Sequence, residues 1–214
     1  MKLVVVGARA DGLAHVVLDL VAEGGEHEVV AFVDDTPDLW NTEVFGIPVI
    51  GPPSGIGQAR LRGAKGAVIA IGSPQARERL APFLHQAGLR LPALVHPSAH
   101  VARSVTVGRG VLVGAMATVI SGAVLEDLVV VSPGAFVSHH VHVGSCTLMA
   151  GRSITGGRCR LGRRVQFGLG ATLLPDRTVG DDAIVGAGAV VVEDVAPGVT
   201  VAGVPARPLR DGGA

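Results

Sequence analysis

Apolar residues recur every six positions along the second half of the chain. Counted from Val101, this series consists almost entirely of aliphatic side chains. Its members are Val101, Val107, Val113, Val119, Leu125, Val131, Val137, Val143, Met149, Thr155, Leu161, Phe167, Leu173, Val179, Val185 and Val191. A second series, four residues further on in each hexad, is small or aliphatic at nearly every position. A short repeat that continues unbroken in this way predicts a β-solenoid.

Three hexads would form one coil of a three-sided prism, in which each hexad supplies a flat side and a turn. Residues eighteen positions apart would then stack on successive coils, about 4.8 Å from each other. Both apolar series are expected to point into the prism. Glycine often follows the first position of a hexad, as at Gly108, Gly144 and Gly156, and we expect it to supply the positive φ of the turns. This all-β domain is predicted to span residues 96–214.

Residues 1–95 follow a different pattern, in which buried-strand segments alternate with amphipathic helical segments. The alternating segments are 2–6, 13–23, 28–33, 66–72 and about 74–86. Strand and helix alternation of this kind predicts a small parallel α/β sheet of the Rossmann type. The sequence therefore predicts a chain of two domains, with an α/β domain before the solenoid.

Ligands of parallel α/β sheets bind beyond the carboxyl ends of the strands. Here those ends carry the loop Gly7–Gly12, the pair Asp34 and Asp35, and Gly72. The loop would offer backbone N–H groups to a diphosphate, and the two carboxylates could bind a ribose or a base or be a solvated loop pair. A dinucleotide fits less well than a mononucleotide carrying a sugar, because Arg9 replaces the glycine that lets a pyrophosphate approach closely.

The composition also indicates which kinds of partner and which compartment to expect. The formal net charge is +0, so no excess of basic residues points to nucleic acid. The cysteines Cys146 and Cys159 show no disulfide or metal spacing. No apolar run approaches the roughly 20 residues that span a bilayer. A strand pattern follows Met1 directly, where a signal peptide would need a longer apolar segment. We therefore expect a cytoplasmic protein with no membrane or nucleic-acid partner.

Three histidines, His139, His140 and His142, fall within one hexad length. Because alternate residues of a strand-like coil face opposite ways, His139 and His140 are not expected to share a site. Eighteen residues after His139 comes Gly157, so a bare backbone N–H would lie one coil from the imidazole. A base beside an N–H donor suits acyl transfer, since one takes a proton and the other stabilises an oxyanion. A zinc site is the alternative, but Ser121 and Gly157 occupy the aligned positions and offer no second imidazole.

Several segments together resemble one family. They are Val4–Ala8, Phe32–Asp35, Ala70–Gly72, Val95–Ala99, Val137–His140, Val185–Val191 and Gly203–Arg207. This combination is similar to the sugar O-acyltransferase family of hexapeptide-repeat acetyltransferases, which includes sialic acid O-acetyltransferases and the bacillosamine- and perosamine-pathway N-acetyltransferases. The resemblance covers essentially the whole chain, and it implies that the solenoid is a left-handed parallel β-helix.

The resemblance also implies roles for particular residues. His139 would be the general base, and the Gly157 N–H would bind the acetyl carbonyl. Acetyl-CoA, as co-substrate, would lie between two subunits of a homotrimer, near Leu148, Leu169 and Ala187 as well as Gly157. The nucleotide sugar would contact Arg9, Ala10, Asp11, Asp34, Asp35 and Gly72.

Two positions depart from the family pattern. An acidic residue usually follows the catalytic histidine, and this chain has His140, so the group that orients His139 stays open. Asp11 stands where the family often has histidine. The expected function is acetyl-CoA-dependent N-acetylation of a nucleotide-linked amino sugar, without a metal. The alternatives are an O-acetyltransferase for sialic acid or a related sugar hydroxyl, and a non-catalytic sugar-nucleotide-binding scaffold.

Overall fold

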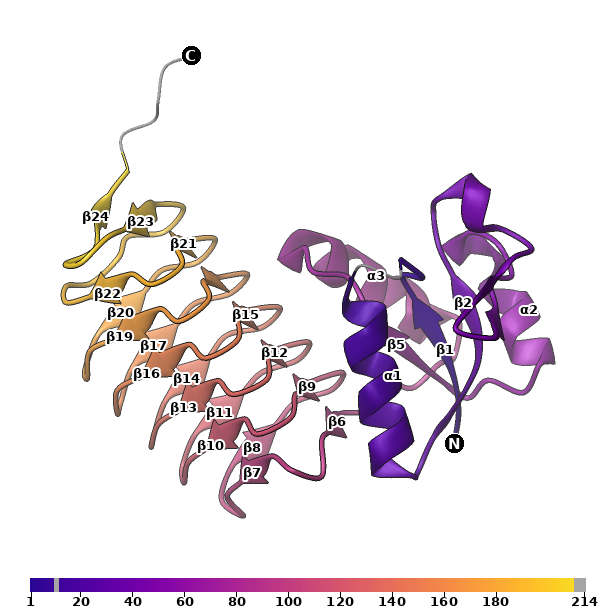
Figure 1. Ribbon diagram of the computed structural model, residues 1–214, viewed down its shortest axis with the longest axis horizontal. Coiled ribbons are helices and arrows are strands. Elements are labelled where there is room, and N and C mark those ends of the chain that lie inside the picture. The colour runs from indigo at the N-terminus through magenta and orange to yellow at the C-terminus, as the bar shows by residue number, and fades with distance from the viewer. Residues whose placement is uncertain (10–11, 210–214) are drawn as a thin grey trace. The chain divides into compact units, whose positions relative to one another are not determined.

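The computed structural model describes residues 1–9 and 12–209, so the predicted substrate contacts Ala10 and Asp11 lie outside the described residues. The chain divides into two compact units, Met1–Pro97 and Ser98–Ala214. Figure 1 shows that helices and a small sheet make up the first unit, and that stacked coils make up the second. Among the described residues, no helix combines the length and the apolar character needed to cross a bilayer.

The first unit is built on three parallel strands in the order β2-β1-β5. These strands and the longer helices are β1 (Lys2–Val6), α1 (Leu13–Gly24), β2 (Glu28–Val33), α2 (Ile56–Leu61), β5 (Gly66–Ile69) and α3 (Pro74–Gln86). The central strand β1 buries four consecutive aliphatic residues, because a parallel strand that is covered on both faces shows no polar alternation. The predicted α/β domain is confirmed.

Short elements connect β2 to β5 and follow α3. They are η1 (Pro37–Leu39), β3 (Glu43–Val44), β4 (Ile47–Pro48), η2 (Pro53–Gly55) and β6 (Leu94–Val95). The strands β3 and β4 form an antiparallel hairpin. At α3, Oγ of Ser73 caps the helix by accepting a hydrogen bond from Ala76 N at 3.3 Å, and Pro74 fills the first turn, where its missing N–H has no cost.

The second unit is a parallel β-solenoid, as predicted from the six-residue repeat. Its strands are β7 (His100–Val101), β8 (Thr106–Val107), β9 (Leu112–Val113), β10 (Thr118–Val119), β11 (Val124–Leu125), β12 (Val130–Val131), β13 (Phe136–Val137), β14 (His142–Val143), β15 (Leu148–Met149), β16 (Ile154–Thr155), β17 (Arg160–Leu161), β18 (Gln166–Phe167), β19 (Thr172–Leu173), β20 (Thr178–Val179), β21 (Ile184–Val185), β22 (Val190–Val191), β23 (Thr200–Ala202) and β24 (Arg207–Pro208).

Three sheets form the sides of the prism. One contains β7-β10-β13-β16-β19-β22, the next contains β8-β11-β14-β17-β20, and the third runs from β9 through β12, β15, β18 and β21 to β23 and β24. Each strand from β7 to β19 pairs in parallel with the strand three elements later, as Thr118 with Phe136 and Val124 with His142. The pairing therefore follows the predicted eighteen-residue coil.

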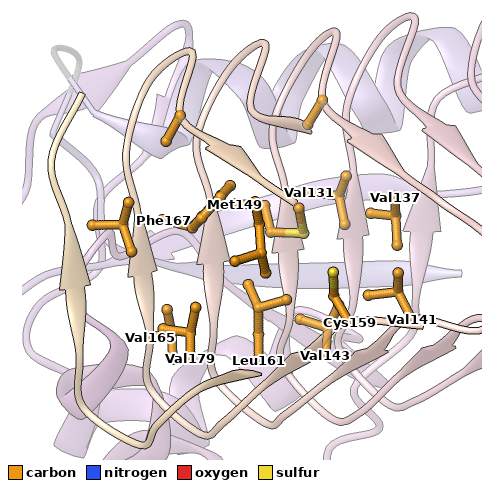
Figure 2. Close-up of a cluster of buried hydrophobic side chains, with 14 of the residues drawn as sticks. Val131, Val137, Val141, Val143, Met149, Cys159, Leu161, Val165, Phe167 and Val179 are labelled. Atoms are coloured by element: carbon orange, nitrogen blue, oxygen red, sulfur yellow. The ribbon is translucent and has the colours of Figure 1, made fainter. Parts of the chain in front are cut away.

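Both apolar series line the interior. Residues from Val111 to Ala206 form one continuous buried cluster along the prism, and Figure 2 shows valine, leucine, methionine and phenylalanine side chains packed between the sheets. One coil differs, because Thr147, Ser153, Thr155 and Cys159 occupy its interior positions. This polar coil directly follows the coil that carries His139.

The glycines after the first hexad position do not have the role predicted for them. Positive φ recurs at every sixth residue from Gly110 to Gly188, and non-glycine residues such as Met116 and Arg158 hold many of these positions. The other glycines are needed for close approach between coils instead. A Cβ on Gly156 would lie 2.5 Å from the backbone nitrogen of Pro175, so the stacking of coils excludes a side chain there.

Candidate active site

The structure brings His139 against Gly157. His139 lies in the turn between β13 and β14, and its ring is half-buried. A Cβ placed on Gly157 would overlap the Cε1 and Nε2 atoms of this ring. The two coils are held in register beside it, because Arg158 N donates to the His139 carbonyl at 2.9 Å. The eighteen-residue alignment thus leaves just enough room for an imidazole over a residue without a side chain.

Gly157 keeps its own N–H available. Its carbonyl accepts a hydrogen bond from Asp176 N at 3.0 Å, and within residues 1–9 and 12–209 its N–H has no hydrogen-bond acceptor. A backbone N–H that points to no partner can donate to a developing oxyanion without first breaking a hydrogen bond. An imidazole and an N–H donor, a pair that suits acyl transfer, therefore lie on neighbouring coils.

His140 contacts His139, contrary to the prediction that the two rings face different sites. Their Nδ1 atoms lie 3.2 Å apart, with the ring planes at 80°. The prediction failed because both residues lie in a turn, where strand alternation does not apply, and His140 has a φ of 55°. Its ring folds back over Gly122, where a Cβ would be 2.9 Å from its Cδ2 atom.

The short contact between these Nδ1 atoms couples the tautomers of the two rings, since one nitrogen must donate and the other accept. When His139 donates from Nδ1, its Nε2 carries the lone pair and can take a proton. His140 then stands as the acceptor that orients the base, the role that a neighbouring group has for many functional histidines.

The third histidine of the cluster is held elsewhere. His142 lies on β14 and pairs through Nε2 with Oε1 of Glu126 at 2.9 Å. Over the described part of the chain, no group of three or more His, Cys, Asp or Glu side chains is arranged to hold a metal ion. The arrangement thus gives no geometric support to a zinc site at this cluster.

An ion pair borders the site on the next coils. Arg158 donates from Nε to Oδ1 of Asp176 at 2.7 Å and from Nη2 to Oδ2 at 2.8 Å. These hydrogen bonds hold the pKa of Asp176 below its ordinary value, and the positive charges of Arg158 and Arg177 act in the same direction. Sequence reasoning missed both residues, although residues 140, 158 and 176 are related by the same eighteen-residue step.

Cys159 lies two residues after Gly157 and does not act as a nucleophile in this arrangement. Its side chain points into the prism and is fully buried, and its Sγ lies 3.1 Å from the Leu174 carbonyl, to which it donates. Burial raises the pKa of the Cys159 thiol, so the sulfur is neutral and inaccessible. The site therefore favours direct transfer over a thioester formed on the protein.

The α/β unit has a separate cavity of about 270 Å³ at the carboxyl ends of β1, β2 and β5. Its lining includes Arg9, Asp34, Asp35 and Gly72, four of the residues that the sequence predicts as contacts of a nucleotide sugar. The lining also includes Leu13, Pro53 and Ile71, which sequence reasoning did not single out. Pro53 comes from the long β2–β5 connection, and no local pattern indicated that this connection would return to the strand ends.

Asp34 and Asp35 have different roles at the cavity. Asp34 is only 8% exposed, and its Oδ2 and Oδ1 accept hydrogen bonds from Ala8 N at 2.7 Å and Thr36 N at 2.8 Å. Burial acts to raise the pKa of Asp34, but the hydrogen bonds from Ala8 and Thr36 outweigh it and the net shift is downward. Asp34 therefore holds the loop after β1, whereas Asp35 is exposed and lines the cavity.

Asp34→Asn is expected to lower the stability of the fold by about 1–3 kcal/mol at neutral pH, because an amide NH₂ would face an N–H donor. The folded pKa lies below the ordinary 3.8, so the carboxylate contributes fully above that value and loses its contribution as the pH falls through the folded pKa. Thermal unfolding from pH 7 to pH 3 measures this. The difference in Tm from wild type should be constant above about pH 5 and shrink below about pH 4, and Asp35→Asn should show no such difference.

Of the predicted acetyl-CoA contacts, Gly157 lies against His139, whereas Leu148, Leu169 and Ala187 lie elsewhere on the prism. Leu169 is 63% exposed, and Gly188 N donates to its carbonyl at 2.7 Å, which stacks Ala187 one coil above it. Both residues belong to turns that enter the sheet containing β13 and β16, whereas His139 and Gly157 belong to turns that leave it. Leu148 lies on β15, in the third sheet.

The chain is similar to a known domain family and to proteins of known structure. Residues 2–83 match the family described as the PglD N-terminal domain. The crystal structure of PerB from Caulobacter crescentus, in complex with CoA and GDP-perosamine, is 33% identical, with 98% of each chain covered and a TM-score of 0.91. The acetyltransferase domain of PglB from Neisseria gonorrhoeae, in complex with acetyl coenzyme A, is 33% identical over 97% of this chain and 98% of that one, with a TM-score of 0.86.

Curated relatives match over part of the chain. A serine acetyltransferase from Mycobacterium tuberculosis is 32% identical over 134 residues, which are 60% of this chain and 56% of the relative. The chain thus spans about half the length of that relative.

Proposed function

The chain belongs to the hexapeptide-repeat acetyltransferases that begin with a PglD N-terminal domain, and from this premise we propose that it transfers the acetyl group of acetyl-CoA to the amine of a nucleotide-linked amino sugar. The observation that carries the proposal is the His139 imidazole lying over Gly157, which has no side chain and, among the described residues, no partner for its N–H. PerB, which the chain resembles over its whole length, was crystallised with CoA and an amino-sugar nucleotide.

In the proposed reaction the sugar amine attacks the thioester carbonyl directly. Nε2 of His139 takes the proton that the amine loses as the new C–N bond forms. The Gly157 N–H donates to the carbonyl oxygen while negative charge develops on it. When the C–S bond breaks, His139 gives this proton to the departing thiolate. The products are free CoA and the amide, and the imidazole is neutral again. His140 holds His139 through the Nδ1 contact during both transfers.

The nucleotide is proposed to bind in the cavity at the strand ends of the α/β unit, with Arg9, Asp35 and Gly72 among its contacts. The family resemblance adds Ala10 and Asp11. Arg9 supplies positive charge for a diphosphate, and the loop after β1 supplies N–H groups. Asp34 supports this loop from below through the hydrogen bond from Ala8 N.

Acetyl-CoA is proposed to bind between two copies of the chain. The Leu169 and Ala187 edge and the His139 edge flank the same sheet, so one chain does not bring both to a single edge. A cyclic trimer would place the apolar edge of one copy beside the His139 edge of the next and create equivalent sites. Both substrates are cytoplasmic metabolites, and we expect the enzyme there.

Release of free thiol from acetyl-CoA tests the proposal against UDP- and GDP-linked amino sugars, with the same sugars lacking the nucleotide as controls. We expect turnover with at least one nucleotide-linked amino sugar, a far lower kcat/KM for its free sugar, and an N-acetyl product by mass spectrometry. Acetylation of a free sialic acid but of no amino sugar would instead make the chain an O-acetyltransferase. No turnover with any of them, together with tight nucleotide-sugar binding, would make it a binding scaffold.

A further inference from the structure

Hydrogen bonds between successive coils follow a regular rule in the solenoid. From Ala102 to Leu174, with one exception, the residue after each inward first-position side chain donates its N–H to the carbonyl of the residue seventeen positions later. Ile120 N donates to the Val137 carbonyl at 2.8 Å, Gly144 N to the Leu161 carbonyl at 2.8 Å, and Gly156 N to the Leu173 carbonyl at 2.7 Å. These bonds fix the spacing of the coils beside every turn.

Ser138 breaks this rule. Its N–H donates to the side-chain Oγ1 of Thr155 at 3.2 Å, and within the described coils no hydrogen bond joins it to the Thr155 carbonyl. The strand pairing shows the same interruption. The strands β13 and β16 pair only at Phe136 and Ile154, whereas β10 and β13 pair at two positions.

The Thr155 hydroxyl accounts for the interruption. Thr155 is the polar member of the otherwise apolar first-position series and is 1% exposed. A hydroxyl buried this deeply needs hydrogen-bond partners, and it finds them in Ser138 N, from which it accepts, and the Phe136 carbonyl, to which it donates at 3.5 Å. The side chain of Thr155 thus takes the place that its own carbonyl would have in a regular coil.

The interruption falls on both strands of the proposed active site. Ser138 directly precedes His139, and Thr155 comes two residues before Gly157. The role of Thr155 in catalysis rests on the proposed function. We infer that Thr155 is a positioning residue for acetyl transfer: its hydroxyl holds the Ser138–His139 peptide away from the regular coil-to-coil bond and so sets the imidazole against Gly157.

The His139 ring has little freedom to move at this site. The His139 ring already fills the space of a Gly157 side chain, so its position depends directly on the separation of the two coils. Closing the regular bond would draw the Ser138 amide toward the carbonyl of residue 155 and carry His139 with it. A displacement of about 1 Å in a reacting group can cost on the order of a hundredfold in rate.

Thr155→Val tests the inference, because valine has the shape of threonine and matches the rest of the series. We expect kcat to fall about 10- to 100-fold, with KM for both substrates within about twofold and Tm equal to or above that of wild type. Thr155→Ser keeps the hydroxyl and should retain most of the wild-type kcat. Thr155→Ala provides a second variant without a hydroxyl if the valine variant does not fold.

Thr147→Val is the matched control. Thr147 lies in the same coil, and its buried hydroxyl donates to the Gly162 carbonyl at 2.7 Å and accepts from Val165 N at 3.0 Å. It is on a different edge from His139, so its variant should lose thermal stability and keep its kcat. A wild-type kcat in Thr155→Val, or equal losses of kcat in Thr155→Val and Thr147→Val, would overturn the inference.

A crystal structure of the Thr155→Val variant decides the matter independently of activity. The inference predicts that Ser138 N donates to the carbonyl of residue 155 and that the His139 ring shifts from its place over Gly157. An unchanged ring position contradicts it. If wild type releases no CoA with any sugar, the proposed function fails, whereas this structural result still tests the role of Thr155 in placing His139.

Discussion

Replacement of His139 with asparagine is expected to reduce kcat for acetyl transfer by about 10²- to 10⁴-fold, the contribution that a general base typically makes. Asparagine keeps a polar side chain of similar reach but cannot take the proton from the attacking amine. The ring is half-buried in a turn and makes no bond that closes a coil, so Tm should stay close to that of wild type. Thiol release at saturating concentrations of both substrates, with thermal unfolding on the same samples, measures both effects.

His142→Asn is the control for this experiment. His142 lies three residues further along the same coil and pairs with Glu126 instead of facing Gly157. Its variant should keep a kcat within a few-fold of wild type. A His139→Asn variant that is as active as wild type, or a larger loss in His142→Asn, would remove His139 from the reaction.

Gly157→Ala is expected to be nearly as damaging to kcat, by a factor on the order of 10² or more. The added methyl group would overlap Cε1 and Nε2 of His139, and the imidazole would have to leave the place from which it can take a proton. Because this ring can swing toward solvent, the fold loses little. We therefore expect a large fall in kcat with only a small change in Tm.

Two neighbouring substitutions separate this steric effect from the general cost of replacing glycine. At Gly156 the new methyl group would meet the backbone nitrogen of Pro175 at 2.5 Å, so Gly156→Ala should lower Tm strongly. At Gly57, in α2, the new group would meet no described atom within 4 Å beyond its chain neighbours and the backbone of its own helix, and Gly57→Ala should leave activity unchanged and raise stability slightly. If Gly157→Ala behaved like Gly57→Ala, the imidazole would not be held against residue 157.

The repeat was predictable from the sequence because it has a physical period. Six residues per side and eighteen per coil place residue 139 beside residue 157, and the structure has this alignment. The glycines show where such reasoning stops. A glycine pattern does not show whether the glycine supplies a positive φ or allows close packing. The structure shows that Gly156 is needed because the backbone of Pro175 leaves no room for a side chain.

The turn carrying the histidines was harder to predict. Strand alternation predicts that His139 and His140 face different sites, but both residues lie in a turn and their Nδ1 atoms are 3.2 Å apart. Thr155 stood out in the sequence as a polar residue in an apolar series. Its bond to Ser138 could not be inferred from that, since a buried threonine can satisfy its hydroxyl in several ways.

In the α/β unit the predicted strand ends do meet at one cavity, because the carboxyl ends of parallel strands share an edge. The sequence does not predict that Asp34 is buried and hydrogen-bonded while Asp35 is exposed, because the two adjacent residues have the same side chain. Only the hydrogen bonds from Ala8 and Thr36 show that Asp34 supports the loop.

The central claim is that His139 and Gly157 act on the two reacting groups from adjacent coils, and a crystal structure with CoA and the nucleotide-linked amino sugar tests it most directly. We predict the sugar amine within about 2.6–3.2 Å of Nε2 of His139, with the Gly157 N–H directed at the site of the thioester carbonyl. An amine bound away from Nε2 of His139, or a Gly157 N–H that faces neither substrate, would contradict the account.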